Sequence, residues 1–151
     1  MAKNKKKIRG TKRGDALFGT SKRDVVIGGK GDDSIETYEG RDKIKAGKGD
    51  DIIESGTGMD TAWGGAGNDV FVTENGSPTN PKEGYVKIMD FEVGDKIEFC
   101  GCLSAKLEQR GKNVWLIKAD DVKAVIKGVD VDDLDIDYGG RVVTFAADPM
   151  A

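Results

Sequence analysis

Single apolar residues recur at every ninth position through the first half of the chain. Counted in nonapeptides from Gly10, the eighth residue of each unit is Leu17, Val26, Ile35, Ile44, Ile53, Ala62 or Phe71. In an extended segment successive side chains point to opposite faces, so the eighth side chain points inward and its neighbours point outward. Repeats of fixed period fold as stacked units. The pattern therefore predicts seven short strands, each made by the last three residues of a unit, over residues 10–72.

The chain changes character after Val72. Residues 73–84, TENGSPTNPKEG, contain two of the three prolines and are predicted to form a loop. Apolar and β-branched residues then alternate or run together, as is typical of strands. Strands are predicted in two runs of YVKIMDFEVGDKIEF, in NVWLIK (113–118), in VKAVIK (122–127) and in RVVTF (141–145). The stretch GVDVDDLDIDYGG is predicted to be a short helical turn or loop.

Composition limits what can hold these strands together. The chain has 151 residues, of which 37% are hydrophobic, and its mean hydropathy is −0.48. One apolar side chain per nonapeptide cannot offset a backbone entropy cost of about 1–2 kcal/mol per residue. The chain also contains no histidine, the commonest general base, which argues against an enzyme. The repeats therefore need another source of stability.

Aspartate and glycine supply that source in the same register. Aspartate is the sixth residue of all seven units, at Asp15, Asp24, Asp33, Asp42, Asp51, Asp60 and Asp69. Glycine recurs at the first, second and fourth positions, where it permits positive φ and lets carbonyl groups turn toward a shared point. Within the units these glycines include Gly28, Gly29, Gly31, Gly40, Gly47, Gly49, Gly58, Gly64, Gly65 and Gly67.

Carboxylate and carbonyl oxygens together are the ligands of a hard cation such as Ca²⁺, which typically takes 6–8 of them. A single aspartate in a glycine-rich turn is more often an Asx-turn without metal. Seven in one register favour metal, so the turns are predicted calcium sites, with Asp33, Asp51 and Asp69 as the best of them.

Three of the units resemble a known repeat. GGKGDDSIE, AGKGDDIIE and GGAGNDVFV resemble the G-G-x-G-x-D-x-U-x nonapeptide of the RTX (repeats-in-toxin) family. MDFEVGDKIEF resembles the D-F-x-x-G-D-K-I stretch that commonly follows RTX repeats. The resemblance implies an all-β fold, a right-handed parallel β-roll with calcium between stacked turns, followed by a β-rich C-terminal cap.

Two nonapeptides form one coil in that family, so alternate units would share an edge of the roll. The resemblance thus implies an odd column of Asp15, Asp33, Asp51 and Asp69, and an even column of Asp24, Asp42 and Asp60. The expected organisation is a basic tail over 1–9, the roll over 10–72, a loop over 73–84 and the cap over 85–151. The aromatic residues expected at the joint between roll and cap are Trp63, Phe71, Phe91, Phe99 and Trp115.

The repeat is imperfect in ways that bear on calcium. Units one and two carry Arg13 and Lys22 at the fourth position, and Arg23 precedes Asp24, so weak or absent calcium is expected there. Two explanations stand equally: a side-chain cation replaces the ion, or a terminal repeat has simply decayed. Tyr38 and Met59 make the even column less regular than the odd one.

Charge is distributed unevenly along the chain. Residues 1–30 carry 10 Lys and Arg against 2 Asp, a net +8, which leaves 14 − 25 = −11 for residues 31–151. The basic run from Lys3 to Arg9 is more typical of a solvated tail than of a nucleic-acid site. The acidic cluster of Asp130, Asp132, Asp133, Asp135 and Asp137 is likewise more typical of a solvated face than of a cation site.

Cys100 and Cys102 are separated by one glycine, and a disulfide closing so short a loop would be strained. Free, buried thiols are favoured, while an intermolecular bridge or half of a zinc site stays open.

These observations favour a non-enzymatic calcium-binding protein that folds when it binds several Ca²⁺ ions. Extracellular calcium modules bind at about 10⁻⁴–10⁻³ M, so millimolar calcium outside a cell would suffice. The family resemblance implies export by type I secretion machinery and an extracellular location. The chain shows neither an apolar segment long enough to span a membrane nor an N-terminal secretory signal.

Two alternatives stay open. The chain resembles the accessory modules of alginate epimerases, which implies calcium-dependent binding of an acidic polysaccharide, with Lys43 and Lys45 on outward strand positions. Outward lysines more often just keep a β surface soluble. The second alternative is that the chain is a fragment of a larger secreted RTX protein.

Overall fold

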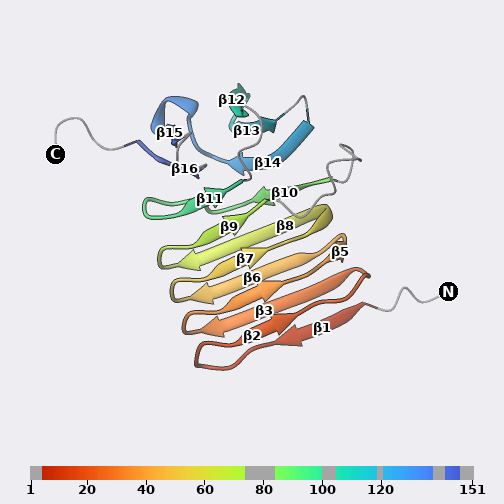
Figure 1. The fold of residues 1–151 in the computed structure, drawn as a ribbon. Coiled ribbons are helices and arrows are strands. Elements are labelled where there is room, and N and C mark those ends of the chain that lie inside the picture. Colours follow the sequence, from red (N-terminus) through yellow and green to blue (C-terminus); the bar gives the residue numbers. More distant parts are fainter. Residues whose placement is uncertain (1–4, 74–83, 100–104, 119–120, 138–141, 147–151) are drawn as a thin grey trace.

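The structure is a computed structural model that describes residues 5–73, 84–99, 105–118, 121–137 and 142–146. Its strands stack as successive rungs, with β1 (Lys6–Arg9) at one end and the C-terminal strands at the other (Figure 1). Helical structure in the described ranges is limited to one 3₁₀ turn, η1 (Val131–Asp133). None of it has the length and apolar character needed to cross a membrane.

One sheet collects the strands of units two, four and six, and we call it the even sheet. Its order is β1, β3 (Asp24–Lys30), β6 (Lys43–Lys48), β8 (Thr57–Ala66), β10 (Gly84–Ile88), β14 (Asp121–Lys127), β13 (Asn113–Lys118) and β12 (Ala105–Arg110), with β5 (Glu39–Gly40) also paired to β8.

The other sheet, called the odd sheet, collects the strands of units one, three, five and seven. Its order is β2 (Ala16–Phe18), β4 (Ser34–Glu36), β7 (Ile52–Glu54), β9 (Val70–Val72), β11 (Lys96–Glu98), β16 (Val142–Phe145) and β15 (Leu134–Asp137).

The repeat strands pair in parallel with a constant register of two nonapeptides. Leu17 lies opposite Ile35, and Ile53 lies opposite Phe71, while in the even sheet Val26 lies opposite Ile44. These eighth-position side chains are buried between the two sheets. The arrangement confirms the parallel β-roll that the resemblance to the RTX family implied.

The stack of rungs continues beyond both boundaries expected for the roll. At the N-terminal end β1 pairs with β3 and places Ile8 beside Val26, so residues 6–9 form a rung where a tail was expected. After residues 73–80 the nine-residue register resumes, and Ile88 and Ile97 lie beside Ala62 and Phe71. The reason is the same in each case, because an apolar residue occupies the eighth position and completes the interior.

Strand lengths differ between the two sheets. The odd-sheet repeat strands are three residues long, as predicted, whereas β3, β6 and β8 run on into the glycines of the next unit. The glycine at the second position makes this possible. Gly47 has φ of 133°, and a Cβ there would meet the carbonyl oxygen of Gly29 in the neighbouring rung.

The C-terminal strands extend both sheets and cover the last rung. The predicted strands at 113–118, 122–127 and 141–145 are present as β13, β14 and β16. Two strands were not predicted, β12 and β15, and the second lies in a segment expected to be a turn or loop. Leu134 of β15 is buried although aspartates follow it in alternation.

Three aromatic rings join the roll to these strands. Phe91 lies 6.2 Å from Phe71 and 5.5 Å from Phe145, measured between ring centroids. The prediction was wrong for Trp63 and Trp115. Trp63 is a ninth-position residue that faces outward beside Lys45, and Trp115 packs under Arg110 at 4.3 Å.

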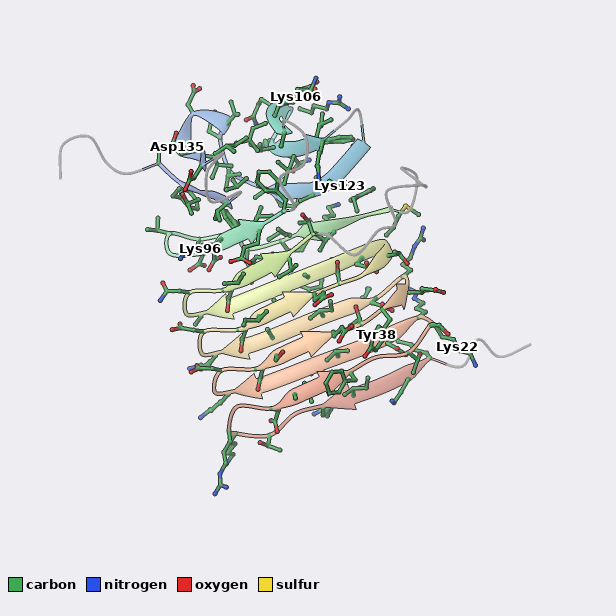
Figure 2. All side chains as sticks on the ribbon, in the orientation of Figure 1. Lys22, Tyr38, Lys96, Lys106, Lys123 and Asp135 are labelled. Carbon is green, nitrogen blue, oxygen red and sulfur yellow. The ribbon has the colours of Figure 1, made fainter. Side chains whose placement is uncertain are left out.

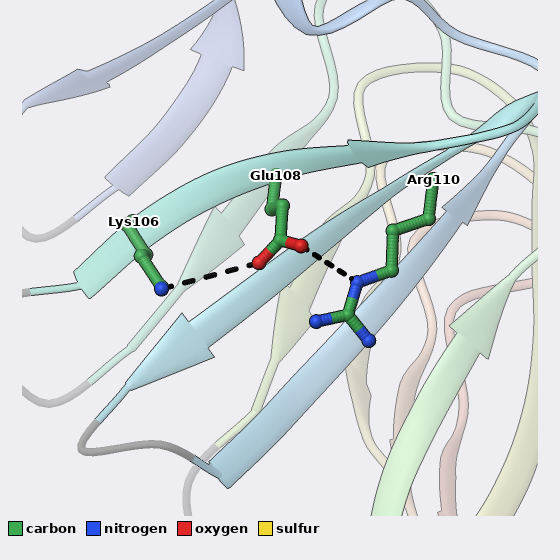
Figure 3. A network of polar contacts seen from close by, with 3 residues as sticks. All are labelled: Lys106, Glu108 and Arg110. Carbon is green, nitrogen blue, oxygen red and sulfur yellow. Dashed lines mark hydrogen bonds and ion pairs between the residues drawn. The ribbon is translucent and has the colours of Figure 1, made fainter.

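The edge strand β12 carries a short charged network. Glu108 accepts a hydrogen bond from Arg110 at 2.9 Å and lies 3.9 Å from Lys106 (Figure 3). Charged side chains on an unpaired edge discourage pairing with another chain. The predictions for Cys100 and Cys102 lie outside the described residues.

Replacing Ile53 with alanine should lower the free energy of unfolding by about 2–5 kcal/mol, because it removes methyl groups from the packed interior. Ile53 is 1% exposed, whereas the adjacent Ile52 is 49% exposed on the outer side of the same strand. Ile52→Ala is the matched control and should change the stability by less than about 0.5 kcal/mol. Denaturant unfolding in excess calcium measures both, and equal losses would contradict the core assignment.

Candidate metal sites in the turns

The seven repeat aspartates form two ladders at the edges of the roll. The backbone N–H of Asp33 donates to Oδ1 of Asp51, and the N–H of Asp42 donates to Oδ1 of Asp60. The same bond joins each neighbouring pair at 2.7–3.0 Å, always 18 residues apart, along Asp15, Asp33, Asp51 and Asp69 and along Asp24, Asp42 and Asp60. The odd and even columns are confirmed.

The second oxygen of the inner carboxylates has no such partner. Oδ2 of Asp33, Asp42, Asp51 and Asp60 is buried and accepts no hydrogen bond. Leaving a buried polar atom unsatisfied costs about 1–3 kcal/mol, and more for a charged one. Four such atoms, in the turns of units three to six, indicate places where an additional positively charged partner fits.

In units three and seven, glycine at the first position keeps space open beside Oδ2. Units four and six have Thr37 and Ser55 there, and their hydroxyls lower the pKa of Asp42 and Asp60, which burial raises. A Cβ on Gly28 would meet both Oδ2 of Asp33 and the carbonyl oxygen of Ala46 in the next rung, and a Cβ on Gly64 would meet Oδ2 of Asp69. A carboxylate oxygen and a backbone carbonyl therefore converge on one small space. This donor set, made only of oxygens, suits Ca²⁺.

The remaining predicted glycines lie in the same turns. Gly29, Gly31, Gly40, Gly47, Gly49, Gly58, Gly65 and Gly67 all have positive φ, and each lies against backbone of the neighbouring rung. The irregularity expected in the even column is also present. Tyr38 occupies a glycine position with φ of 64° and is the one non-glycine residue with positive φ among those described.

The odd column continues one rung further than predicted. The N–H of Asp69 donates to Oδ1 of Asp95 at 2.9 Å, and the N–H of Gly64 donates to Oδ1 of Asp90 at 3.0 Å. Counted as a nonapeptide, DFEVGDKIE has Asp95 at the sixth position and Ile97 at the eighth. This match to the repeat is the signal that could have identified Asp95 and Ile97. In the even column Val86 lies opposite Asp60 and ends the series.

Electrostatics in the columns reflects carboxylates packed close together. Burial raises the pKa of Asp60 and Asp69 to about 7, and that of Asp42 and Asp51 to about 6. Neighbouring carboxylates raise the pKa further, as Asp33 does for Asp51, while the amide hydrogen bond to Oδ1 lowers it. A cation among these oxygens would favour the charged forms.

At the fifth position, exposed Asp32 and Asp50 form a similar ladder, in which the N–H of Asp50 donates to Oδ1 of Asp32 and the N–H of Asn68 donates to Oδ1 of Asp50. The acidic cluster around η1 lacks this arrangement. Asp130, Asp132, Asp133, Asp135 and Asp137 are all exposed, and Asp130 caps η1 by accepting the N–H of Asp132. Among the described residues, no three acidic or cysteine side chains come together as a metal cluster. The turns can hold a metal because backbone carbonyls supplement the carboxylates.

Comparison with known proteins locates the repeats independently. Residues 9–44, 18–53 and 45–79 each match the family model described as RTX calcium-binding nonapeptide repeat (4 copies). The chain is also similar to the solution structure of the AlgE6R3 subunit from the Azotobacter vinelandii mannuronan C5-epimerase. That match has 24% identity and a TM-score of 0.32, and it covers 79% of this chain and 73% of that one. No curated protein matches the chain.

Without metal, the roll should be more stable at pH 5 than at pH 8. Asp60 and Asp69 have pKa values of about 7 in the folded chain, against about 3.9 when unfolded. The folded state therefore binds more protons between these values, and its stability falls as the pH rises from about 4 through about 7. Thermal unfolding in calcium-free buffer at the two pH values measures this.

The variant Asp60→Asn provides the control, because an amide does not titrate in this range. Its stability should depend less on pH than that of the unmodified chain. A metal-free chain that melts at the same or a higher temperature at pH 8 would contradict the assignment.

Proposed function

Because residues 9–79 belong to the RTX calcium-binding nonapeptide repeat family, we propose that this chain binds several calcium ions in its turns and forms the β-roll on binding them. The observation that carries the proposal is the set of buried carboxylate oxygens without partners on Asp33, Asp42, Asp51 and Asp60. Each belongs to the sixth residue of a repeat, in units three to six. Bound Ca²⁺ supplies the positive charge that these oxygens lack.

The residues proposed to hold calcium are the inner aspartates and the glycines beside them. Asp33, Asp51 and Asp69 serve the odd column, with Asp95 closing it, and Asp42 and Asp60 serve the even column. The aspartates orient themselves through the Oδ1 ladder, and the glycines keep the carbonyl oxygens within reach. This is a structural role, and the proposed function includes no catalytic step.

Calcium dependence supports an extracellular site of action. A ligand that binds only the folded state stabilises it by RT ln(1 + [L]/Kd), about 2.7 kcal/mol per site at 100 Kd. Sites with Kd of about 10⁻⁴–10⁻³ M fill in extracellular calcium and stay empty at cytosolic levels. The chain would leave the cell unfolded, through type I secretion machinery, and fold outside.

A second candidate function is binding of an acidic polysaccharide, and the outer face of the even sheet favours it. Lys43 and Lys45 are exposed on β6, with Lys7 and Arg9 on β1 and Lys87 on β10 in the same outward positions. Nζ of Lys45 lies 5.3 Å from the centroid of the Trp63 ring on the next strand. Val25, Ile27 and Thr61 lie between these cations on the same face. A group of cations beside an aromatic ring suits a chain of negatively charged sugars.

Calcium should produce a cooperative, reversible gain of β signal in far-UV circular dichroism, and the same concentration of magnesium should not. Asp51→Asn removes one charged ligand of an inner turn, so it should move the calcium midpoint to higher concentration. The control Asp135→Asn alters an exposed aspartate of β15 and should leave the midpoint unchanged (Figure 2). A chelated chain that is already fully β and unaffected by calcium would overturn the proposal.

Reversing the charge of Lys43 and Lys45 should weaken binding of short uronate oligomers at least tenfold, as measured by calorimetry in calcium. Both side chains are exposed, so the double variant K43E/K45E should keep the fold. The control K106E/K112E makes the same charge change at two exposed lysines, on β12 and in the turn after it, and should bind normally. Binding that persists in high salt, or in K43E/K45E, would contradict this candidate.

A further inference from the structure

The first two turns satisfy their aspartates in a way that the inner turns do not. Thr11 donates to Oδ2 of Asp15 twice, from its backbone N–H at 2.6 Å and from its hydroxyl at 2.9 Å. Thr20 does the same for Oδ2 of Asp24, at 2.7 Å and 2.9 Å. Two separate turns in different columns thus share one geometry, with threonine at the second position of the unit.

Oδ2 is the oxygen that lacks a partner in the inner turns. Where unit three and unit five have Gly29 and Gly47 at the second position, with φ of 137° and 133°, Oδ2 of Asp33 and Asp51 accepts nothing. Thr11 and Thr20 do not have positive φ. Threonine therefore changes the path of the turn and brings two donors to the oxygen that would otherwise face a cation.

The basic residues of these turns do not take that place. Arg13, Lys22 and Arg23 are exposed, and within the described residues none of them forms an ion pair with a column aspartate. Lys22 lies at the outer edge of its turn (Figure 2). The structure thus supports neither a fixed side-chain cation nor simple decay, because the threonine contacts are specific and repeated.

The other end of the odd column is closed in a similar way. Oδ2 of Asp95 accepts the backbone N–H of Glu92 at 2.8 Å, while its Oδ1 accepts the N–H of Asp69. Both terminal carboxylates of this column, Asp15 and Asp95, therefore have protein donors on Oδ2. Asp24 begins the even column and keeps one oxygen without a partner, Oδ1, while its Oδ2 accepts from Thr20.

We propose that Thr11 and Thr20 take the place of calcium in the first two turns, so that the N-terminal end of the roll is closed without metal. Calcium is thereby confined to the inner turns. In the odd column these start with the turn of Asp33, and in the even column with the turn of Asp42. The inference rests on the proposed calcium binding and adds to it which turns bind and which do not. It also makes the second residue of each unit the feature that decides: threonine in the first two units, and a residue with positive φ, glycine or Tyr38, in units three to six.

Restoring the glycines of unit two tests the inference by gain of a site. The double variant T20G/K22G rebuilds the G-G-x-G-x-D order over residues 19–24. Native mass spectrometry and calorimetry in calcium should count one more ion per chain than in the unmodified protein. The matched control K22G keeps the threonine and should show no gain. A gain in K22G alone, or an unchanged count in T20G/K22G, would overturn the inference.

Two conservative substitutions provide a test that does not depend on rebuilding a turn. Asp24→Asn should leave the ion count unchanged, whereas Asp42→Asn should lower it by one. A loss of one ion in Asp24→Asn would overturn the inference. Thr20→Ala should lower the melting temperature by a similar amount with calcium and without it, since its hydroxyl bond is independent of metal.

Failure of the inference differs from failure of the proposed function. If the unmodified chain binds no calcium at all, the proposed function fails and the ion counts of all variants are zero. If the unmodified chain binds several ions and the variants disagree with the expected counts, calcium binding stands and the role of threonine is wrong.

Discussion

The structure depends on how each sixth-position carboxylate uses its two oxygens. Oδ1 accepts the N–H of the aspartate one rung earlier, which fixes the register of the rungs at 18 residues. Oδ2 is then held inside the glycine-rich turn, where it is buried. Because one group performs both tasks, the bond that aligns the rungs also creates the place where a cation is needed.

This double use explains why a thin interior is sufficient. Each rung adds one apolar side chain per sheet to the core, such as Ile35 opposite Ile53, and such a rung cannot offset its own backbone entropy. The carboxylates destabilise the metal-free roll by repulsion and burial, and under the proposed function bound Ca²⁺ reverses this effect. Under that proposal the stability of the roll depends on the surrounding calcium concentration as well as on the chain.

Sequence reasoning succeeded where the period is unbroken and failed where it is interrupted. The core followed from position eight, and the columns followed from position six together with the family resemblance, since both positions act through the regular register. Asp95 was missed because residues 73–80 shift the frame, although the ladder offset simply grows from 18 to 26 residues. Trp63 was wrongly expected at the joint between the roll and the cap, although its ninth position predicts an outward side chain.

Other differences have causes that lie outside any one unit. β12 and β15 are polar edge strands, and pairing with β13 and β16 determines them more than their own residues do. The role of Thr20 was missed because a residue in place of glycine looks like loss of the motif. The proposed role of Thr20 becomes apparent only from the hydrogen bond that its hydroxyl donates to Asp24.

The outward-facing strand positions can vary in sequence, because neither the aspartate ladder nor the apolar interior restricts them. In the odd sheet Glu36 lies directly opposite Glu54, and burial together with this neighbour raises the pKa of Glu54. In the even sheet Lys45 lies opposite Trp63 at the equivalent position. Neither pair contributes to the aspartate ladder or the interior, and like charges in adjacent rungs are unfavourable for folding. The paired glutamates therefore lower the stability of the roll, whereas Lys45 over the Trp63 ring raises it, so the two outer faces differ both in charge and in what they contribute to folding.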